Sequence, residues 1–411
     1  MSPVFWWASC LAAAALASPA SAAPLTFTEA LRTAEASAPS LQATALGVEA
    51  SRSEARAAGA LPDPKLAFGL DNFPVSGPPA GRFNADEMTM ARVGIQQEVP
   101  NAARRRAQVA AGEADIGVAQ ALAAAQARKV RVATALAWID LVYAERGLAA
   151  LDQLTAGLKG VWEVQPASIA SGAGRPAGGL ESRRLRAQFD DQRSELAAAV
   201  VKARAELARW TGDPAPSAEG DAPDFPIDAA ALRTGLERNP TLLAYRSVSQ
   251  KAQAQVDAAR AATRPDWAFD LSYQRRDPMF GDMVSLGATV SLPLFARTRQ
   301  EPVIAARIAD LARARVERED ARRALVASLD ADLADHAMHH DQWARSAQVL
   351  VPAAEQRGHL ELESYAAGRA DFGDVVAALT SLAETKLQAL ERQARVARDG
   401  ARIVLTYGSA P

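Results

Sequence analysis

Repeated short motifs are the feature that most constrains what this chain can fold into. They recur at a nearly constant spacing of 193 to 201 positions, so the register is kept across most of each half. A sequence duplicated on this scale predicts one architecture used twice. The matched pairs are Leu31-Arg32-Thr33 with Leu232-Arg233-Thr234, Ala67-Phe68 with Ala268-Phe269, Gly94 with Gly287, and Gly174-Arg175 with Gly368-Arg369.

The first 22 residues are predicted to be a signal peptide. Residues 4–16 form an apolar run, and Ala20-Ser21-Ala22 gives the small-residue pattern that precedes cleavage. Cys10, the only cysteine, lies inside this segment. We therefore expect an exported chain whose mature form has no cysteine and therefore no disulfide, thiolate metal site or acyl anchor.

The rest of the chain limits how it can meet a membrane or a nucleic acid. No stretch after residue 23 offers about 18 uninterrupted apolar residues, so any insertion into a bilayer must use strands. The formal net charge of −2 gives no support for a nucleic-acid surface.

Each repeat reads as helix, strand, loop, strand, long helix, turn and long helix. In the first repeat a helix is expected over residues 27–61, because Pro62 and Pro64 stop it. Strands are expected at about 65–73 and 88–99, and again at about 266–274 and 283–292. We predict a first repeat over residues 23–211, a linker over 212–228 and a second repeat over 229–411.

The fourth predicted strand has two chemically different sides. Val284, Leu286 and Val290 alternate with small polar residues such as Ser285 and Thr289. A strand of nine to ten residues with this alternation suits an outer-membrane crossing, with lipid on one side and water on the other. A hairpin of a soluble sandwich shows the same alternation, so the pattern alone leaves both open.

The long helical segments predict coiled-coil hairpins. Alanine is abundant, charged residues make up 23%, and the apolar positions recur at helical spacing. Each long helix would span on the order of 100 Å. Pro166 and Pro352 are expected to kink or divide these helices, and the hairpin tips are placed at residues 171–179 and 366–374.

Several local motifs, in this order and spacing, resemble those of the TolC-like outer-membrane efflux protein family. They are the strand exits Gln97-Glu98-Val99-Pro100 and Ser291-Leu292-Pro293-Leu294, the tip Tyr365-Ala366-Ala367-Gly368-Arg369-Ala370-Asp371-Phe372, and the repeat ends Trp210-Thr211-Gly212 and Tyr407-Gly408. The first exit and the tip are most similar to the heavy-metal cation branch, the CzcC-like and CusC-like proteins.

The resemblance implies a fold class, a location and partners. The fold would be an α+β membrane protein: a trimer whose twelve-stranded outer-membrane β-barrel, with four strands per chain, continues as a long α-helical coiled-coil tunnel across the periplasm. The chain would be a passive conduit for heavy-metal cations in a tripartite efflux system. A periplasmic adaptor and a proton-driven inner-membrane pump would be its partners, with outer-membrane lipid around the barrel.

Other functions stay open at this stage. Within the family, the same channel could serve drug or solvent efflux or protein secretion. In another class, a periplasmic adaptor or a coiled-coil scaffold protein would also combine a signal peptide with helical hairpins. No enzyme motif is present, so catalysis and a cofactor are not expected.

Two sets of candidate residues lie at the helical tips. The resemblance implies that Gly174, Arg175, Gly368 and Arg369 contact the adaptor, although glycines in a tight reversal give the same pattern. It also implies that Asp374, and with it Asp371, forms an acidic channel constriction. Acids in the first turn of a helix are an alternative explanation, because they complement the helix dipole.

Two further sets lie elsewhere. Arg104, Arg106, Arg297 and Arg299 follow the strand exits at matching positions. They predict a basic ring at the junction of barrel and tunnel, although arginines at a solvated helix start give the same pattern. His336 and His340 lie one helical turn apart, with Asp332 a turn earlier, a spacing that could hold a divalent cation. A conduit gains nothing from tight binding, so a histidine cluster without metal is the favoured interpretation.

Overall fold

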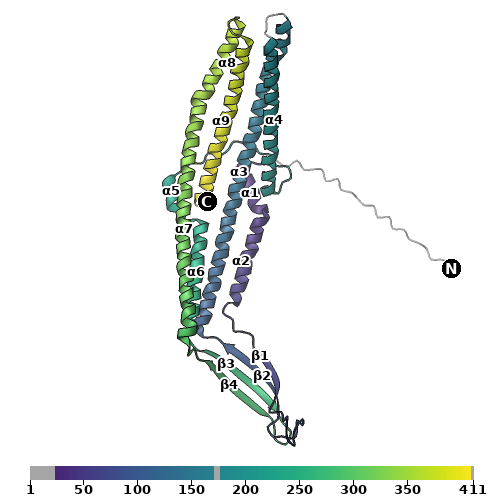
Figure 1. The fold of residues 1–411 in the computed structure, drawn as a ribbon, viewed down its shortest axis with the longest axis vertical. Coiled ribbons are helices and arrows are strands. Elements are labelled where there is room, and N and C mark those ends of the chain that lie inside the picture. The colour runs from purple at the N-terminus through teal and green to yellow at the C-terminus, as the bar shows by residue number, and fades with distance from the viewer. Residues whose placement is uncertain (1–23, 171–175, 409–411) are drawn as a thin grey trace, which may run out of the picture. The chain divides into compact units, whose positions relative to one another are not determined.

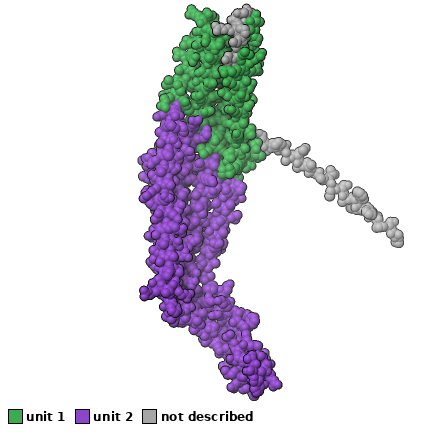
Figure 2. Space-filling view, in the orientation of Figure 1, with its two compact units in different colours: residues 1–37, 134–223, 343–394 green, residues 38–133, 224–342, 395–411 purple. Residues whose placement is uncertain are grey.

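The computed structural model describes residues 24–170 and 176–408, and it divides into two compact units (Figure 2). Unit 1 comprises residues 1–37, 134–223 and 343–394, and unit 2 comprises residues 38–133, 224–342 and 395–411. Each unit thus combines segments from both halves of the chain. The predicted signal peptide, together with Gly174 and Arg175 of the first tip, lies outside the described residues.

The described chain is mostly helical, with four strands (Figure 1). In chain order the elements are α1 (Phe27–Ser37), α2 (Pro39–Ala57), β1 (Lys65–Asp71), β2 (Met90–Val99), α3 (Ala102–Ala170), α4 (Pro176–Thr211), α5 (Ala229–Gly235), the 3-10 helix η1 (Leu236–Arg238), α6 (Pro240–Ala261), β3 (Asp266–Arg275), β4 (Met283–Ser291), α7 (Ala296–Arg345), the π-helix η2 (Ser346–Leu350), α8 (Val351–Ala366) and α9 (Phe372–Tyr407).

The prediction of a single helix over residues 27–61 is wrong, because the structure has two helices there, α1 and α2. Thr26 and Glu29 form a capping box at the start of α1, and α2 begins anew at Pro39. Ala38 is extended, with φ −63° and ψ 117°, as a residue before proline prefers to be. Pro240 starts α6 in the same way, so the break occurs at the matching position of both repeats.

The two prolines expected to kink or divide the long helices behave differently. Helix α3 continues through Pro166, so no division occurs there. The neighbouring turns hold it in place, since Leu158 and Trp162 pack into the core of unit 1. Ahead of Pro352 the helix widens into the π-turn η2 before α8 begins. A π-turn is a usual site of local irregularity in a helix.

The sheet of unit 2 is an antiparallel meander in the order β1-β2-β3-β4. Strand β2 pairs with β3 although they come from different repeats, with Gly94 opposite Ser272 and Val93 opposite Tyr273. The strands begin and end within two residues of the positions expected from the sequence. Strands β1 and β4 are the two edges, and each has a sheet neighbour on one side only within the described chain.

The core of unit 1 forms where three helices meet. Helices α3, α4 and α9 contribute the buried side chains, and Trp162 and Leu379 pack against their edge. These positions recur at helical spacing, so each helix turns one apolar stripe toward the other two. The core residues are Leu151, Leu158, Leu185, Phe189, Val376 and Ala383.

Trp138 fixes the start of the described chain in unit 1. Its side chain is fully buried in α3, and its Nε1–H donates a hydrogen bond of 2.8 Å to the carbonyl oxygen of Leu25. The ring of Phe27 meets it edge-on, with centroids 5.4 Å apart. Burial of this indole is stabilising, because the ring leaves water while its N–H keeps a hydrogen-bond partner.

The core of unit 2 links α5, η1, α7 and α9 through five buried residues, Leu232, Leu236, Leu329, Ile403 and Tyr407. The last turn of α9 is capped from α3, where the Arg128 guanidinium donates to the carbonyl oxygens of Thr406 at 2.8 Å and Gly408 at 3.0 Å. Burial lowers the pKa of Arg128. The cap satisfies carbonyl groups that the end of a helix leaves unpaired.

No described helix combines the length and the apolar character that a membrane crossing requires.

The Trp138 anchor gives a stability prediction. Trp138→Ala removes a fully buried ring and its hydrogen bond, so we expect a loss of about 3–5 kcal/mol and a lower midpoint for thermal loss of helical circular dichroism. Trp210→Ala is the control, because Trp210 is only partly buried. Equal midpoints for the two variants would contradict the anchoring role.

Candidate channel surfaces

One face of the four-stranded sheet is apolar and exposed. The register places apolar side chains of neighbouring strands directly opposite each other, as in the pairs Phe68 with Val93 and Leu271 with Leu286. Phe68 is 83% exposed and Leu286 is 81% exposed. A continuous apolar face of this kind must be covered by something other than water. Its large residues are Leu66, Phe68, Leu70, Val93, Ile95, Trp267, Phe269, Leu271, Tyr273, Val284 and Leu286.

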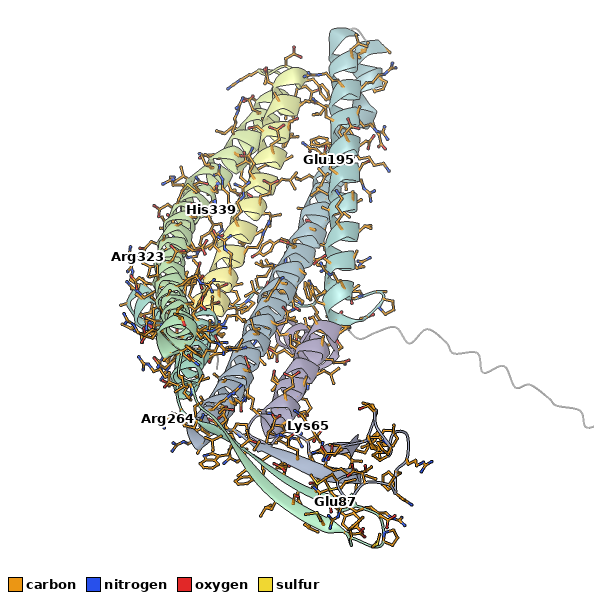
Figure 3. All side chains as sticks on the ribbon, turned by 60° about the horizontal axis from the view of Figure 1, so that its bottom comes forward. Lys65, Glu87, Glu195, Arg264, Arg323 and His339 are labelled. Atoms are coloured by element: carbon orange, nitrogen blue, oxygen red, sulfur yellow. The ribbon has the colours of Figure 1, made fainter. Side chains whose placement is uncertain are left out.

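The opposite face of the sheet is polar and internally bonded. Gln274 donates from Nε2 to the hydroxyl oxygens of Ser272 at 3.0 Å and Ser285 at 2.9 Å, joining β3 to β4. Figure 3 shows Lys65 at the start of β1 and Glu87 in the loop between β1 and β2. One apolar and one polar face is the arrangement of a strand that separates lipid from water.

The arginines predicted at the junction divide into two groups. Arg104 donates from Nη1 to Asp266 Oδ2 at 3.1 Å, so it ties the start of α3 to the start of β3. Among the described residues, no carboxylate pairs with the exposed Arg106, Arg297 or Arg299. The four arginines therefore differ in role: Arg104 joins two elements of the fold, whereas Arg106, Arg297 and Arg299 are exposed at the surface.

The turn between α8 and α9 is held by its backbone. Gly368 has φ +66°, its N–H donates to the Tyr365 carbonyl oxygen, and the Arg369 N–H donates to that of Ser364 at 2.8 Å. These bonds form a Schellman motif, which needs a residue in the left-handed region and so favours glycine. The motif leaves the Arg369 side chain exposed at the surface.

The two candidate constriction residues lie at the start of α9. The Asp371 N–H donates to Asp374 Oδ2 at 3.1 Å, and the Phe372 N–H donates to Asp371 Oδ1 at 2.8 Å. Acidic side chains at this position satisfy donors that the first turn leaves unpaired. Both carboxylates are nevertheless exposed, so capping does not remove their charge from the surface.

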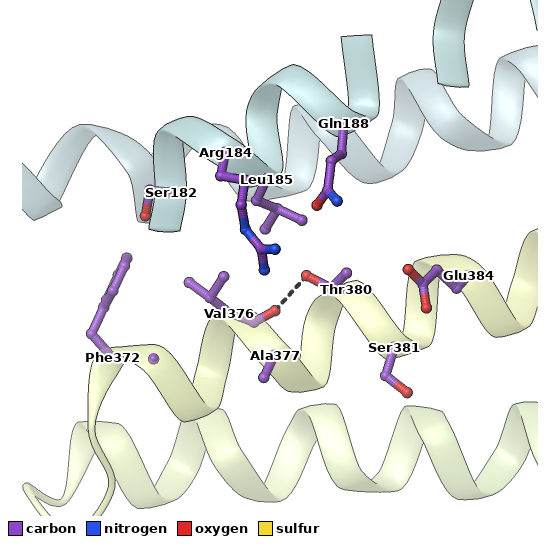
Figure 4. A pocket seen from close by; sticks show the side chains of 11 residues that line it. Ser182, Arg184, Leu185, Gln188, Phe372, Val376, Ala377, Thr380, Ser381 and Glu384 are labelled. Atoms are coloured by element: carbon purple, nitrogen blue, oxygen red, sulfur yellow. Dashed lines mark hydrogen bonds between the residues drawn. The ribbon is translucent and has the colours of Figure 1, made fainter. Parts of the chain in front are cut away.

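A groove of about 560 Å³ lies between α4 and α9 in unit 1 (Figure 4). Arg184 and Gln188 reach into it from α4, facing Thr380 and Glu384 on α9, and Phe372 closes one end. Sequence reasoning missed this groove, because it arises from two helices almost 200 residues apart. The apolar spacing along each helix predicts a packed face but does not show which partner it meets.

His339, which lies between His336 and His340 in the sequence, is part of a hydrogen-bonded network in unit 2. His339 Nδ1 lies 2.6 Å from Asp399 Oδ2, and Asp332 accepts from the Tyr407 hydroxyl at 2.7 Å and pairs with Arg402 at 3.1 Å. Burial lowers the pKa of His336 and raises the pKa of Tyr407 to about 12.

Asp332 is therefore engaged with Tyr407 and Arg402. The rings of His336 and His340 lie 6.3 Å apart. Among the described residues, no group of three His, Cys, Asp or Glu side chains is placed to hold a metal ion. The geometry that would make His336, His340 and Asp332 a metal site is not formed.

Comparison with known proteins gives consistent results. Residues 231–409 match the family model described as outer membrane efflux protein. The chain is 25% identical over 379 residues to the cobalt-zinc-cadmium resistance protein CzcC of Cupriavidus metallidurans, covering 90% of this chain and 86% of that protein.

Solved structures share the fold at low sequence identity. A membrane protein from Pseudomonas aeruginosa superposes with a TM-score of 0.82 at 17% identity, covering 93% of this chain and 90% of that one. CusC gives 0.79 at 14% identity, covering 93% and 92%. The outer membrane protein VceC of Vibrio cholerae gives 0.77 at 17% identity, covering 93% and 96%.

These findings confirm the resemblance found in the sequence: residues 231–409 match the outer membrane efflux protein family, and the similarity to CzcC covers 90% of the chain. The predicted fold class is confirmed for the chain, with four strands and long helical hairpins built from two tandem repeats. The protein is located in the outer membrane and extends into the periplasm. The apolar face of the sheet is accordingly the lipid face and the polar face lines the lumen.

The face assignment predicts an asymmetric effect of a charge on β4. Leu286→Arg places a cation in the hydrocarbon at a cost of about 2–4 kcal/mol near the midplane, so we expect little protein in the outer-membrane fraction. Thr289→Arg, on the lumen side of the same strand, is the matched control and should accumulate normally. The assignment is refuted if both variants reach the same level in outer-membrane fractions.

Proposed function

We propose that this chain is the outer-membrane channel of a tripartite efflux system and a passive conduit for heavy-metal cations. The observation that carries the proposal is the similarity to the cobalt-zinc-cadmium resistance protein, which extends through both repeats and 90% of the chain. The conduit binds no cofactor and is not an enzyme. Its chemistry consists of lining charges and moving helices, and the driving energy comes from a partner.

The channel forms when three copies close one barrel. Strands β1 and β4 present free edges in a sheet whose one face meets lipid. Unpaired backbone groups are not tolerated in hydrocarbon, so each edge pairs with the edge of a neighbouring copy. Three copies give twelve strands, which enclose a lumen wide enough for a hydrated ion.

The helical tips meet the partner proteins. The exposed Arg369 follows the backbone-held turn at Gly368, and with Gly174 and Arg175 of the first hairpin it supplies contacts to a periplasmic adaptor. A rigid turn with an exposed cation suits recognition, because little conformational entropy is lost on binding. The adaptor connects the channel to a proton-driven pump in the inner membrane.

The acidic start of α9 forms the constriction. In a trimer, Asp374 and Asp371 contribute six carboxylates around the axis, which favours cations and opposes a fully closed state through repulsion. The bond from the Asp371 N–H restrains the Asp374 carboxylate, and the bond from the Phe372 N–H restrains the Asp371 carboxylate. Capping and gating are therefore performed by the same side chains.

The outward-facing arginines of the second repeat meet the lipid. Arg297 and Arg299 follow the exposed apolar residues Leu294 and Phe295 at the end of β4. Long cationic side chains beside an apolar surface extend to the phosphate level of a bilayer while their stems stay in contact with it. This places the periplasmic boundary of the membrane at the start of α7.

Growth of a deletion strain tests the cargo. We expect the strain to become sensitive to zinc, cobalt and cadmium, with little change toward dyes, detergents and antibiotics, and the wild-type gene to restore tolerance. The Leu286→Arg gene should fail to restore it. Sensitivity to organic compounds alone would assign the channel to drug or solvent efflux, and a defect in protein export would assign it to secretion.

The histidine cluster gives a second test of the conduit mechanism. A chain in which His336 and His340 are both replaced by Gln should confer full metal tolerance, because a conduit gains nothing from binding its cargo tightly. Tolerance is read as the metal concentration that halves growth, with trimer amounts matched on blots. A large loss of tolerance at equal amounts would mean that the cluster handles the cargo.

A further inference from the structure

Asp270 is the lumen-side acid that the fold leaves without a counter-ion. It lies near the middle of β3, opposite Gln96 of β2 on one side and Gly287 of β4 on the other. Among the described residues no hydrogen bond or ion pair engages its half-buried carboxylate. Gln96 and Gly287 carry no charge. The nearest cation in the cross-strand row that contains Asp270 is Lys65 of β1, which is two strands and about 10 Å away.

The other charged residues of the lumen face are paired. Lys65 Nζ lies 2.5 Å from Glu98 Oε1, and Arg92 Nε lies 3.2 Å from Asp71 Oδ2. The remaining acid, Asp266, is paired with Arg104. Ion pairs that neutralise each other contribute little field at a distance, so Asp270 sets the charge of the strands that line the lumen.

Two matched glycines shape this row of the sheet. A Cβ added to Gly287 would lie 2.4 Å from Asp270 Oδ1 and 2.7 Å from Oδ2, so the carboxylate extends over the bare backbone of β4. A Cβ added to Gly94, the equivalent residue of the first repeat, would lie 2.8 Å from Ser272 Cβ. The duplicated glycine thus makes room for a β3 side chain in both repeats, and only at Gly287 is that side chain charged.

We propose that Asp270 determines the cation preference of the barrel lumen, a role separate from that of the acidic start of α9. In the trimer three Asp270 carboxylates lie at one level of the barrel, each held over Gly287. They raise the local concentration of cations through their unpaired charge without coordinating them, so the ion is attracted and released. The inference rests on the proposed channel function, and it adds a second selectivity element on the lumen wall.

The test is the reversal potential of purified trimers in planar bilayers under a salt gradient. Low salt, around 10 mM, is used because the screening length is then about 30 Å. All variants also carry Asp371→Asn and Asp374→Asn, so that the constriction adds no charge of its own. Asp270→Asn should lower the cation-over-anion permeability ratio about twofold or more, and Asp270→Glu should keep it high.

Glu87→Gln is the matched control. It removes the same charge from the exposed loop between β1 and β2, and it should leave the ratio unchanged. A ratio for Asp270→Asn equal to that of the parent, with intact trimers on gels, overturns the role of Asp270 and leaves the channel function standing. A parent protein that forms intact trimers but conducts no ions overturns the channel function itself.

Discussion

Backbone hydrogen bonding at the edges of the sheet is the constraint on which the rest of the structure depends. Strands β1 and β4 each leave a row of N–H and C=O groups unpaired within the described chain, and the apolar face beside them lies in lipid. Each unpaired group costs several kcal/mol in hydrocarbon. A single copy is therefore unstable in the membrane, and assembly is a condition of insertion rather than a later refinement.

Duplication provides a simple way to build a four-stranded sheet with one apolar and one polar face. Each repeat supplies one hairpin, and the pairing of β2 with β3 joins the two hairpins in a register that places Val93 beside Tyr273 and Ile95 beside Leu271 on the apolar face. A slip of one residue would turn every lipid-facing side chain into the lumen, so the register is strongly specified. The helices inherit the same repetition, with α2 and α6 both starting at a proline.

Much of this architecture could be predicted from the sequence, because a strand between lipid and water displays its two faces as a strict alternation. The break at Pro39 was missed, since helical periodicity continues on both sides of it. The groove lined by Arg184 and Glu384 depends on which helices meet. The isolation of Asp270 depends equally on cross-strand pairing. The spacing of residues within one segment does not indicate which distant segments that segment will contact.

The candidate site residues show the same division between local and long-range information. The Gly368 turn and the acidic start of α9 follow local rules of helix ends, and they lie between α8 and α9. Their contacts with an adaptor and around a constriction belong to the assembled channel and remain proposals.

The most direct test of the three-chain barrel is the mass, by native mass spectrometry, of the complex extracted from outer membranes in mild detergent. Three copies of the mature chain are predicted, and a monomer, a dimer or a tetramer would contradict the twelve-stranded barrel.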